Sequence, residues 1–242
     1  MSTPHAQPAP PAPPVPVLTI SCAAALRPAL ERASTAYYQK SGVRVEAQYG
    51  ASGTLLSSLV LVQQGDLYLP ADDSFLADAQ QKALLRDSYP LARMTPVIFV
   101  PAGNPRKIAA LSDLWKPGVR VACADPETAS ISRVTRAVLQ KSGDWPRLAP
   151  HITVTLPTVT DVANAVKLGT VDAGIVWDAV ARQYPEMVMI HVPLLEQARH
   201  QVALGVLTTS RHPQQAEEFA TFLASPEGQA IFHGLGYETV TG

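Results

Sequence analysis

The chain has 242 residues, of which 47% are hydrophobic and 16% are charged, and its formal net charge is −1 at pH 7. This length allows one large domain or two modest ones, and the composition is typical of a folded protein with a sizeable core. The sequence has no face rich in lysine and arginine, which argues against nucleic acid or an anionic membrane as the principal partner. No apolar run is long enough to cross a membrane.

Residues 1–16 differ from the rest of the chain because prolines there alternate with alanines and other small residues. This pattern predicts an extended, polyproline-like linker that belongs to no packed element. Linkers of this kind often tether an exported domain, so we expect a periplasmic or membrane-tethered extracytoplasmic protein whose secretion signal, of the ordinary or the lipoprotein kind, has been removed. The alternative is a cytosolic protein with a proline-rich tail.

The first folded element is expected to be a buried strand over residues 17–20. Small residues follow at 21–25 and lead into a helix whose apolar face carries Leu26, Leu30 and Ala33. The first turn of a helix leaves backbone N–H groups without intrahelical partners. The amides around Ala24 and Ala25 are therefore a candidate cluster of donors at the end of a strand.

The turn at residues 49–55 has the same organisation and is the most informative stretch of the chain. It follows an alternating strand at 43–47, brackets Ser52 with Gly50 and Gly53, and continues into an apolar helix. The free amides and the dipole of a helix N-terminus can hold an oxyanion without lysine or arginine. The alternative is that Ser52 merely caps its own helix.

Two later segments repeat this arrangement. A strand at 119–123 is followed by a polar turn that contains Ser130, Ile131 and Ser132, and then by a helix. Thr158, Thr160 and Asp161 precede a helix predicted over residues 162–168, with Asp161 placed as a cap or first-turn acid. In open α/β sheets ligands bind beyond the carboxyl ends of the strands, so these turns are expected to converge on one crevice.

The sequence contains no recognisable catalytic or metal-binding motif. It lacks a nucleophile elbow, a phosphate-binding loop and a dinucleotide fingerprint, and its six histidines have no metal-ligand spacing. We therefore expect no enzyme, no cofactor and no metal site, and we interpret Asp72 and Asp73 as a solvated loop. Cys22 and Cys123 are either free buried thiols or, if two strand ends approach within about 6 Å, a disulfide.

The order of the elements predicts an α/β protein with two lobes, each a mixed sheet flanked by helices. The first lobe is expected to comprise residues 17–95 and 206–242, and the second residues 96–205. Strands near 95–101 and 202–208 would cross between the lobes, which implies a hinged cleft. The chain is expected to end in a helix that Ser225 caps, with Pro226 in its first position.

Several segments resemble the periplasmic substrate-binding proteins of ABC importers and, among these, the molybdate-binding family. The resemblance extends over residues 17–240, and its matching segments are 18–26, 50–55, 65–72, 125–127, 174–177 and 225–232. The last segment is common to many binding proteins. The turn at 50–55 together with the strand exit at 125–127 is more specific to the molybdate-like branch.

The resemblance implies a type II periplasmic-binding fold and a ligand site made mainly of backbone amides. The family uses two serine hydroxyls in the first lobe; Ser52 matches the second serine, whereas Ala25 replaces the first. The amides of the second lobe fall on Ile131 and Val162, and Trp177 replaces a tyrosine. An indole N–H can donate a hydrogen bond but cannot accept one. The predicted ligand site comprises Ala24, Ala25, Ser52, Gly53, Ser130, Ile131, Val162 and Trp177.

The function implied by the resemblance is capture of a small oxyanion, molybdate or tungstate, in the interlobe cleft and its delivery to an ABC permease in the inner membrane. A monomer that binds no nucleic acid is expected. Three alternatives stay open: a pocket retuned to another oxyanion, a small carboxylate or a metal complex; a ligand sensor that is not coupled to transport; and an enzyme built on the same architecture.

Overall fold

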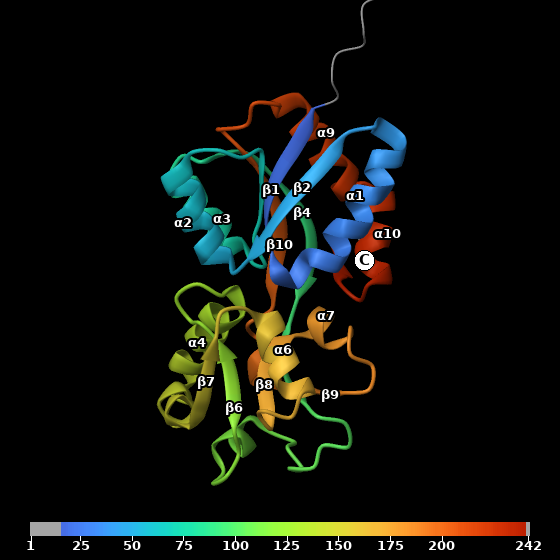
Figure 1. The fold of residues 1–242 in the computed structure, drawn as a ribbon. Helices are drawn as coiled ribbons and strands as arrows, with labels where there is room; N and C mark the ends of the chain where they lie inside the picture. Colours follow the sequence, from blue (N-terminus) through green and yellow to red (C-terminus); the bar gives the residue numbers. More distant parts are fainter. Residues whose placement is uncertain (1–15, 241–242) are drawn as a thin grey trace, which may run out of the picture.

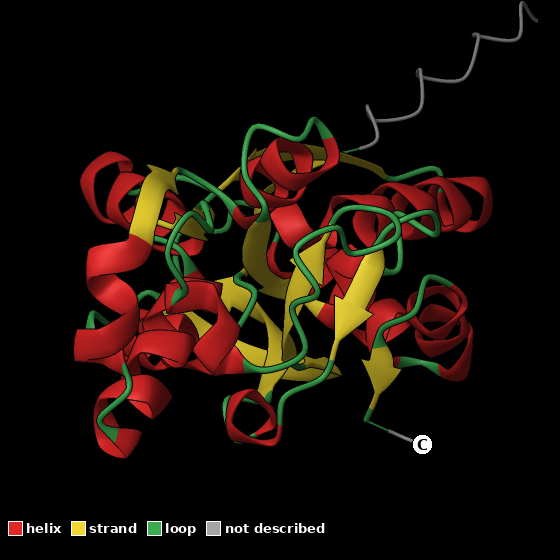
Figure 2. Ribbon diagram, turned by 90° about the horizontal axis from the view of Figure 1, so that it is seen from below, coloured by secondary structure: helices red, strands yellow, loops and turns green. Residues whose placement is uncertain are grey.

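Two lobes, one above the other, make up the computed structural model, which describes residues 16–240 (Figure 1). The linker predicted for residues 1–16 lies, except for Pro16, outside the described residues. The first lobe contains a six-stranded sheet of order β11-β4-β10-β3-β1-β2, and the second a five-stranded sheet of order β7-β6-β8-β5-β9. Helices surround the strands of both sheets (Figure 2). The predicted two-lobed α/β class is confirmed.

The first lobe combines the two ends of the described chain. Strand β1 pairs in parallel with both β2 and β3, so the carboxyl ends of these three strands meet at one edge of the sheet. The elements of its first part are β1 (Val17–Ala23), η1 (Ala24–Leu26), α1 (Arg27–Ser41), β2 (Arg44–Gly50), α2 (Ser52–Val62), β3 (Leu67–Leu69), α3 (Asp73–Gln81) and β4 (Leu85–Met94). Its last part contributes β10 (His200–Leu207), α9 (Pro213–Ala224), α10 (Pro226–Gly234) and β11 (Glu238–Thr239). Ser225 caps α10, as predicted.

The second lobe is built from the middle of the chain. Strand β6 pairs in parallel with β7 and β8, while β5 runs antiparallel to β8 and β9. Its elements before β7 are β5 (Pro96–Val100), η2 (Leu111–Trp115), β6 (Val121–Ala124), α4 (Ser130–Ser142), α5 (Trp145–Leu148) and η3 (Ala149–His151). The remaining elements are β7 (Ile152–Leu156), α6 (Val159–Lys167), β8 (Ala173–Trp177), α7 (Asp178–Ala181), β9 (Val188–Ile190) and α8 (Pro193–Glu196).

The chain crosses between the sheets twice. Thr95 alone separates β4 from β5, and it is held on both sides by Asp178: the Thr95 N–H donates to the Asp178 carboxylate at 3.0 Å, and the Asp178 N–H donates to the Thr95 carbonyl at 2.9 Å. The return to the first sheet occurs before His200, because β10 pairs with β4 from that residue onward. The predicted return at residue 206 is therefore too late.

Helix α6 begins three residues before the predicted start at residue 162. The Thr158 hydroxyl accepts from the Asp161 N–H at 3.2 Å, and the Asp161 carboxylate accepts from the Thr158 N–H at 3.0 Å. This reciprocal arrangement is a capping box, which makes Thr158 the N-cap. The helix consequently starts at Val159, and Val162 belongs to the end of its first turn.

The acidic pair at 72–73 is also different from the prediction. Asp72 is fully buried, and its carboxylate caps α3 by accepting from the Ser74 N–H at 2.6 Å. The interpretation of this pair as a solvated loop is wrong for Asp72, because the capping role draws its side chain into the fold. Cys22 and Cys123 are both free and buried, and burial raises the pKa of the Cys123 thiol to about 12.

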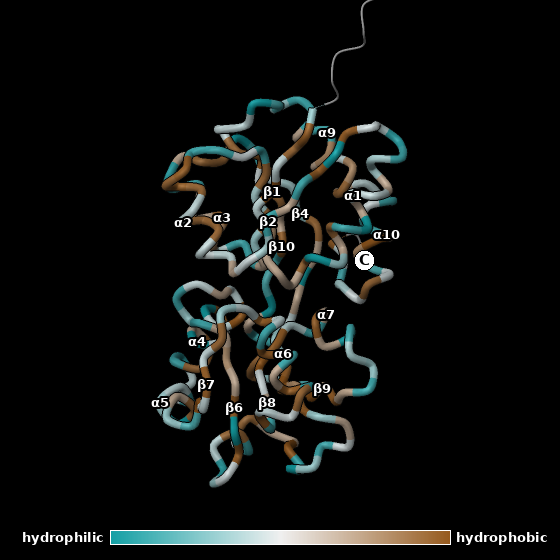
Figure 3. Tube along the Cα trace, viewed as in Figure 1, coloured by the Kyte–Doolittle hydropathy of each residue, from teal (hydrophilic) through white to brown (hydrophobic). Residues whose placement is uncertain are grey.

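Hydrophobic side chains fill the space between each sheet and its helices. The last turn of α2 departs from this pattern, since Leu61 is 85% exposed, and it forms a hydrophobic stretch at the edge of the first lobe (Figure 3). Within residues 16–240 no helix combines the length and the apolar character that a membrane crossing needs.

The packing of α6 on β8 requires a glycine. A Cβ atom at Gly174 would lie 2.5 Å from Cγ1 of Val162 and 3.2 Å from Cγ2 of Val166. We expect Gly174→Ala to lower the free energy of unfolding by about 1–3 kcal/mol, because overpacking forces the helix away from the sheet.

Urea unfolding followed by circular dichroism measures this effect. Gly234→Ala is the matched control, since a Cβ atom there meets nothing within 4 Å, and its effect should stay within about 0.5 kcal/mol. Equal stability of the two variants would show that α6 has room to move.

Candidate functional site

A small cavity of about 20 Å³ lies between the two lobes. That volume exceeds the roughly 10–15 Å³ that one water molecule needs. Its wall is formed where strands end and helices begin: Ala23 and Gly50 end β1 and β2 in the first lobe, and Trp177 ends β8 in the second. The starts of η1, α2, α4 and α6 complete the wall. The predicted convergence of strand ends on one crevice is thus what the fold shows.

Most of the predicted site residues meet at this cavity. Six of the eight line its wall, and they are Ala24, Ala25, Ser52, Ser130, Ile131 and Trp177. Gly53 and Val162 do not line it. Several further residues that were not predicted from the sequence line the wall, among them Ala71, Ala129, Thr158 and Val159.

Gly53 has a different role from the one predicted. Its N–H donates to the Thr128 carbonyl at 2.7 Å, across the cleft between the lobes. A Cβ atom at this position would lie 2.9 Å from the Phe75 ring and 3.0 Å from Cα of Thr128. The absence of a side chain therefore lets the two lobes approach, and the amide is not available to a ligand in this arrangement.

Val162 is replaced at the cavity by Val159. The Val162 N–H is used inside the helix, where it donates to the Thr158 carbonyl at 3.2 Å, and its side chain is fully buried. Because α6 starts at Val159, the amide at the helix start is that of Val159. The capping-box spacing of Thr158 and Asp161 is the sequence signal that would have located this start correctly.

The Ser52 hydroxyl is oriented by two donors from different lobes. Its oxygen accepts from the Ala71 N–H at 3.1 Å and from the Ser130 hydroxyl at 2.9 Å. Ser52 does not cap α2, because the N-cap is Ala51 and has no side-chain hydrogen bond. The alternative that Ser52 merely caps its helix is therefore wrong. With both lone pairs engaged, the Ser52 proton is the one hydroxyl hydrogen left to donate at this wall.

Several backbone amides at the wall have no hydrogen-bond partner within residues 16–240. They belong to first-turn positions, where the helix itself provides no acceptor. These amides are those of Ala25, Ser52, Ser130, Ile131 and Val159. Four separate helix starts thus present unused N–H groups around one cavity.

Trp177 adds a donor of another kind. Its side chain is fully buried, and its indole Nε1 has no hydrogen-bond partner among the described residues. A buried donor without an acceptor costs about 1–3 kcal/mol, and native proteins rarely tolerate it. Trp177 thus ends a buried strand and also lines the cavity.

The cavity wall is electrically neutral apart from its dipoles. Of residues 16–240, none that lines the cavity carries a charged side chain. Helix starts supply roughly half a positive charge each, and these partial charges favour an anion. The arrangement can therefore hold a small acceptor-rich group by N–H and O–H donors alone.

Three residues next to this wall do not line it. Tyr68 is fully buried, and its hydroxyl donates to the Ser52 carbonyl at 2.8 Å. Burial, assisted by the nearby charge of Asp72, raises the pKa of Tyr68 well above its ordinary value, so this hydroxyl stays protonated. Tyr49 lies under the Arg27 guanidinium at 4.0 Å, and Asp178 holds the crossing at Thr95.

The comparisons with known proteins agree with this architecture. The molybdate-binding protein ModA of Mycobacterium tuberculosis is 28% identical over 240 residues, which cover 98% of this chain and 90% of that protein. The periplasmic molybdate-binding protein of Azotobacter vinelandii superposes with a TM-score of 0.79 at 19% identity, covering 91% of this chain and 98% of that one. The sulfate-binding protein SubI of Mycobacterium tuberculosis gives 0.80 at 19% identity, with coverage of 93% and 87%.

The fold of these solved structures is the two-lobed, type II periplasmic-binding fold, as the sequence predicted. Proteins of this group bind solutes for transporters and are not enzymes, which disfavours the catalytic alternative. The model of the bacterial extracellular solute-binding proteins matches residues 18–238, and the chain belongs to that family.

Proposed function

We propose that this solute-binding protein captures a small, fully ionised oxyanion of the molybdate and tungstate class and presents it to an ABC permease. The observation that supports the proposal is that residues with partnerless donors, five helix-start amides and the Trp177 indole, line one cavity without charged side chains. The similarity to molybdate-binding proteins supports the same ligand class. A membrane tether, a monomeric state and the permease partner belong to the proposal as well.

Donors without acceptors select for the charge state of the ligand. A fully ionised oxyanion has only acceptor oxygens, and each of them can take N–H or O–H groups from the wall. An anion that keeps a proton would need an acceptor for it. Both lone pairs of Ser52 are engaged, which leaves the hydroxyl oxygens of Ser130 and Thr158 as side-chain acceptors at the wall. The partnerless N–H groups outnumber these acceptors, so the wall favours dianions without a proton.

Two departures from the molybdate-binding pattern bear on the exact ligand. Ala25 contributes an amide but no hydroxyl, and Trp177 brings a larger ring than a tyrosine. Losing a donor to a charged ligand costs about 1.5–3 kcal/mol, or tenfold and more in affinity. Because of these two changes, the second candidate for the ligand, after molybdate and tungstate, is another tetrahedral dianion such as sulfate. A role as a sensor rather than in transport would leave the same binding chemistry in place.

The two lobes are already in contact around the cavity. The same contacts would enclose a ligand bound there. Besides the Ser52–Ser130 and Gly53–Thr128 hydrogen bonds, Arg133 of the second lobe pairs with Asp78 of the first at 2.7 Å. A ligand that bridges both lobes stabilises this closed arrangement in proportion to its preference for it. The crossings at Thr95 and before His200 are where the chain would bend.

A thermal-shift screen tests the proposed ligand class. The purified protein is heated with molybdate, tungstate, sulfate, phosphate and small carboxylates in turn. A ligand present at 100 times its Kd adds about 2.7 kcal/mol, which corresponds to a rise in Tm of roughly 5–10 °C for a chain of this size. We expect molybdate and tungstate to give such a rise and phosphate to give none. A response to carboxylates alone would refute the oxyanion assignment.

Ser52→Ala should weaken oxyanion binding by more than tenfold, because it removes the hydroxyl donor oriented by Ala71 and Ser130. Isothermal titration calorimetry measures the affinity, and circular dichroism checks the fold. Ser57→Ala is the matched control, since Ser57 is exposed on the same helix. Unchanged affinity in Ser52→Ala would remove Ser52 from the site.

Trp177→Phe should weaken binding by about tenfold, because the phenyl ring retains most of the packing but has no N–H donor. The stability of the ligand-free protein should change much less, since the indole N–H has no partner to lose there. Trp145→Phe, in α5 of the same lobe, serves as the control. Equal affinities of the two variants would assign Trp177 a packing role only.

Asp78→Asn should shift the ligand-free protein toward an open form, because it removes the interlobe ion pair with Arg133. The side chains are 37% and 33% exposed, so the pair contributes about 1 kcal/mol at most and the shift is about fivefold or less. Small-angle scattering detects opening as a larger radius of gyration. The control is Glu127→Gln, which breaks a pair with Arg136 inside the second lobe. An unchanged closed population would show that the ion pair is irrelevant to closure.

A further inference from the structure

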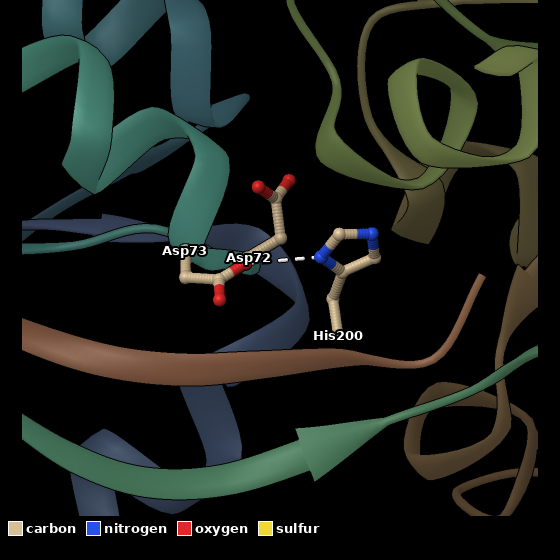
Figure 4. Close-up of side chains that lie close together, drawn as sticks. All are labelled: Asp72, Asp73 and His200. Carbon is tan, nitrogen blue, oxygen red and sulfur yellow. Dashed lines mark hydrogen bonds and ion pairs between the residues drawn. The ribbon is translucent and has the colours of Figure 1, made fainter.

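Three metal-ligating side chains from distant parts of the sequence meet in the first lobe, outside the cavity wall. They are Asp72, Asp73 and His200, and one potential ligand atom from each lies within 4.8 Å of the others. His200 Nδ1 lies 3.0 Å from an oxygen of Asp73, the contact that Figure 4 marks with a dashed line. The Asp72 carboxylate lies beside this pair (Figure 4).

Asp72 is the unusual member of the group. Its side chain is fully buried, yet one carboxylate oxygen, Oδ2, has no hydrogen-bond partner within residues 16–240. The other oxygen, Oδ1, is used by the Ser74 amide in capping α3. A buried charged oxygen normally has a partner or a metal ion, because desolvation is otherwise costly. The free oxygen of Asp72 is therefore available to a cation.

The neighbouring charges do not compensate this cluster. Arg133 is the basic group whose charge acts on Asp72, but its guanidinium is paired with Asp78 at 2.7 Å. Tyr68, also near Asp72, stays protonated and neutral because burial raises its pKa. The Asp72 and Asp73 carboxylates thus share one imidazole, and the guanidinium that acts on Asp72 is already paired with another carboxylate.

We propose that Asp72, Asp73 and His200 bind one divalent transition-metal cation of the zinc class. Two carboxylate oxygens and one imidazole nitrogen are a ligand set that zinc accepts, with water completing a tetrahedron. Zinc–ligand distances of about 2.0–2.2 Å require the three ligand atoms to approach one another to roughly 3.5 Å. Asp73 and His200, whose side chains are 51% and 33% exposed, have the freedom to move and leave the site open to solvent.

The position of the site indicates what a bound cation would do. Asp72 and Asp73 lie at the start of α3, and His200 is the first residue of β10, where the chain re-enters the first sheet. A cation would tie this helix to the strand that follows the interlobe crossing. The site involves none of the residues that line the cavity, so it does not depend on the proposed oxyanion function.

Zinc titration of the full chain tests the site. The probe is Zn²⁺ alone, added to metal-stripped protein in a calorimeter, with no oxyanion present. We expect one strong site in the unaltered chain and at least tenfold weaker binding in Asp72→Asn, Asp73→Asn and His200→Gln. Asparagine at position 72 keeps an oxygen for the α3 cap. His191→Gln, which alters the exposed His191–Glu196 pair at 3.7 Å, is the matched control and should bind as before.

The melting temperature provides a second readout that does not depend on heat of binding. Zn²⁺ should raise the Tm of the unaltered chain and of His191→Gln, and should leave that of His200→Gln unchanged. Should Asp72→Asn fail to fold, the surface variants Asp73→Asn and His200→Gln decide the question. Absence of zinc binding by the unaltered chain, or undiminished binding in both surface variants, would overturn the proposal.

Discussion

The site depends on one constraint: the backbone N–H groups at a helix start have no acceptors within the helix and must find them elsewhere. Parallel strands bring the ends of β1 and β2 together in one lobe, and those of β6 and β8 in the other. The helices whose starts line the cavity follow β1, β2, β6 and β7, and β8 contributes Trp177 at its own end. Closure of the two lobes removes water from these amides, so an acceptor-rich ligand is what satisfies them. The buried indole of Trp177 has the same requirement.

The different roles of the Ser52 and Ser130 hydroxyls follow from this constraint. Ser130 of the second lobe donates to Ser52 of the first, and the Ala71 amide donates to the same oxygen. The Ser52 proton therefore remains free to be donated to a ligand. Because one of the two orienting donors comes from the second lobe, contact between the lobes itself orients the Ser52 hydroxyl. Negative charge lies close by but outside the wall, since Asp72 directly follows Ala71. A cation held by Asp72, Asp73 and His200 would offset that charge beside an anion-binding cavity.

Hydrophobic periodicity and turn chemistry predicted the two-lobed α/β class and most of the turns that line the cavity, whereas Trp177 was named through the family resemblance. The sequence located the start of α10, because a serine cap followed by proline is a strong helix-start pattern. It misplaced Val162, since apolar spacing alone does not fix a helix start and the capping box of Thr158 and Asp161 was overlooked. The meeting of His200 with Asp72 and Asp73 could not be predicted, because residues so distant in sequence meet only through the packing of α3 against β10. The close approach of Gly53 to Thr128 likewise depends on how the lobes close.

The central claim is that backbone amides of four helix starts, with Ser52 and Trp177, hold a small oxyanion without help from a charged side chain. A crystal structure of the protein grown with molybdate tests it most directly, because the anomalous signal of molybdenum locates the ion independently of the fitted protein atoms. The account predicts the ion between the lobes, with amide nitrogens of Ala25, Ser52, Ile131 and Val159 at hydrogen-bond distance. Molybdate bound by lysine or arginine side chains elsewhere, with nothing in the cavity, would contradict it.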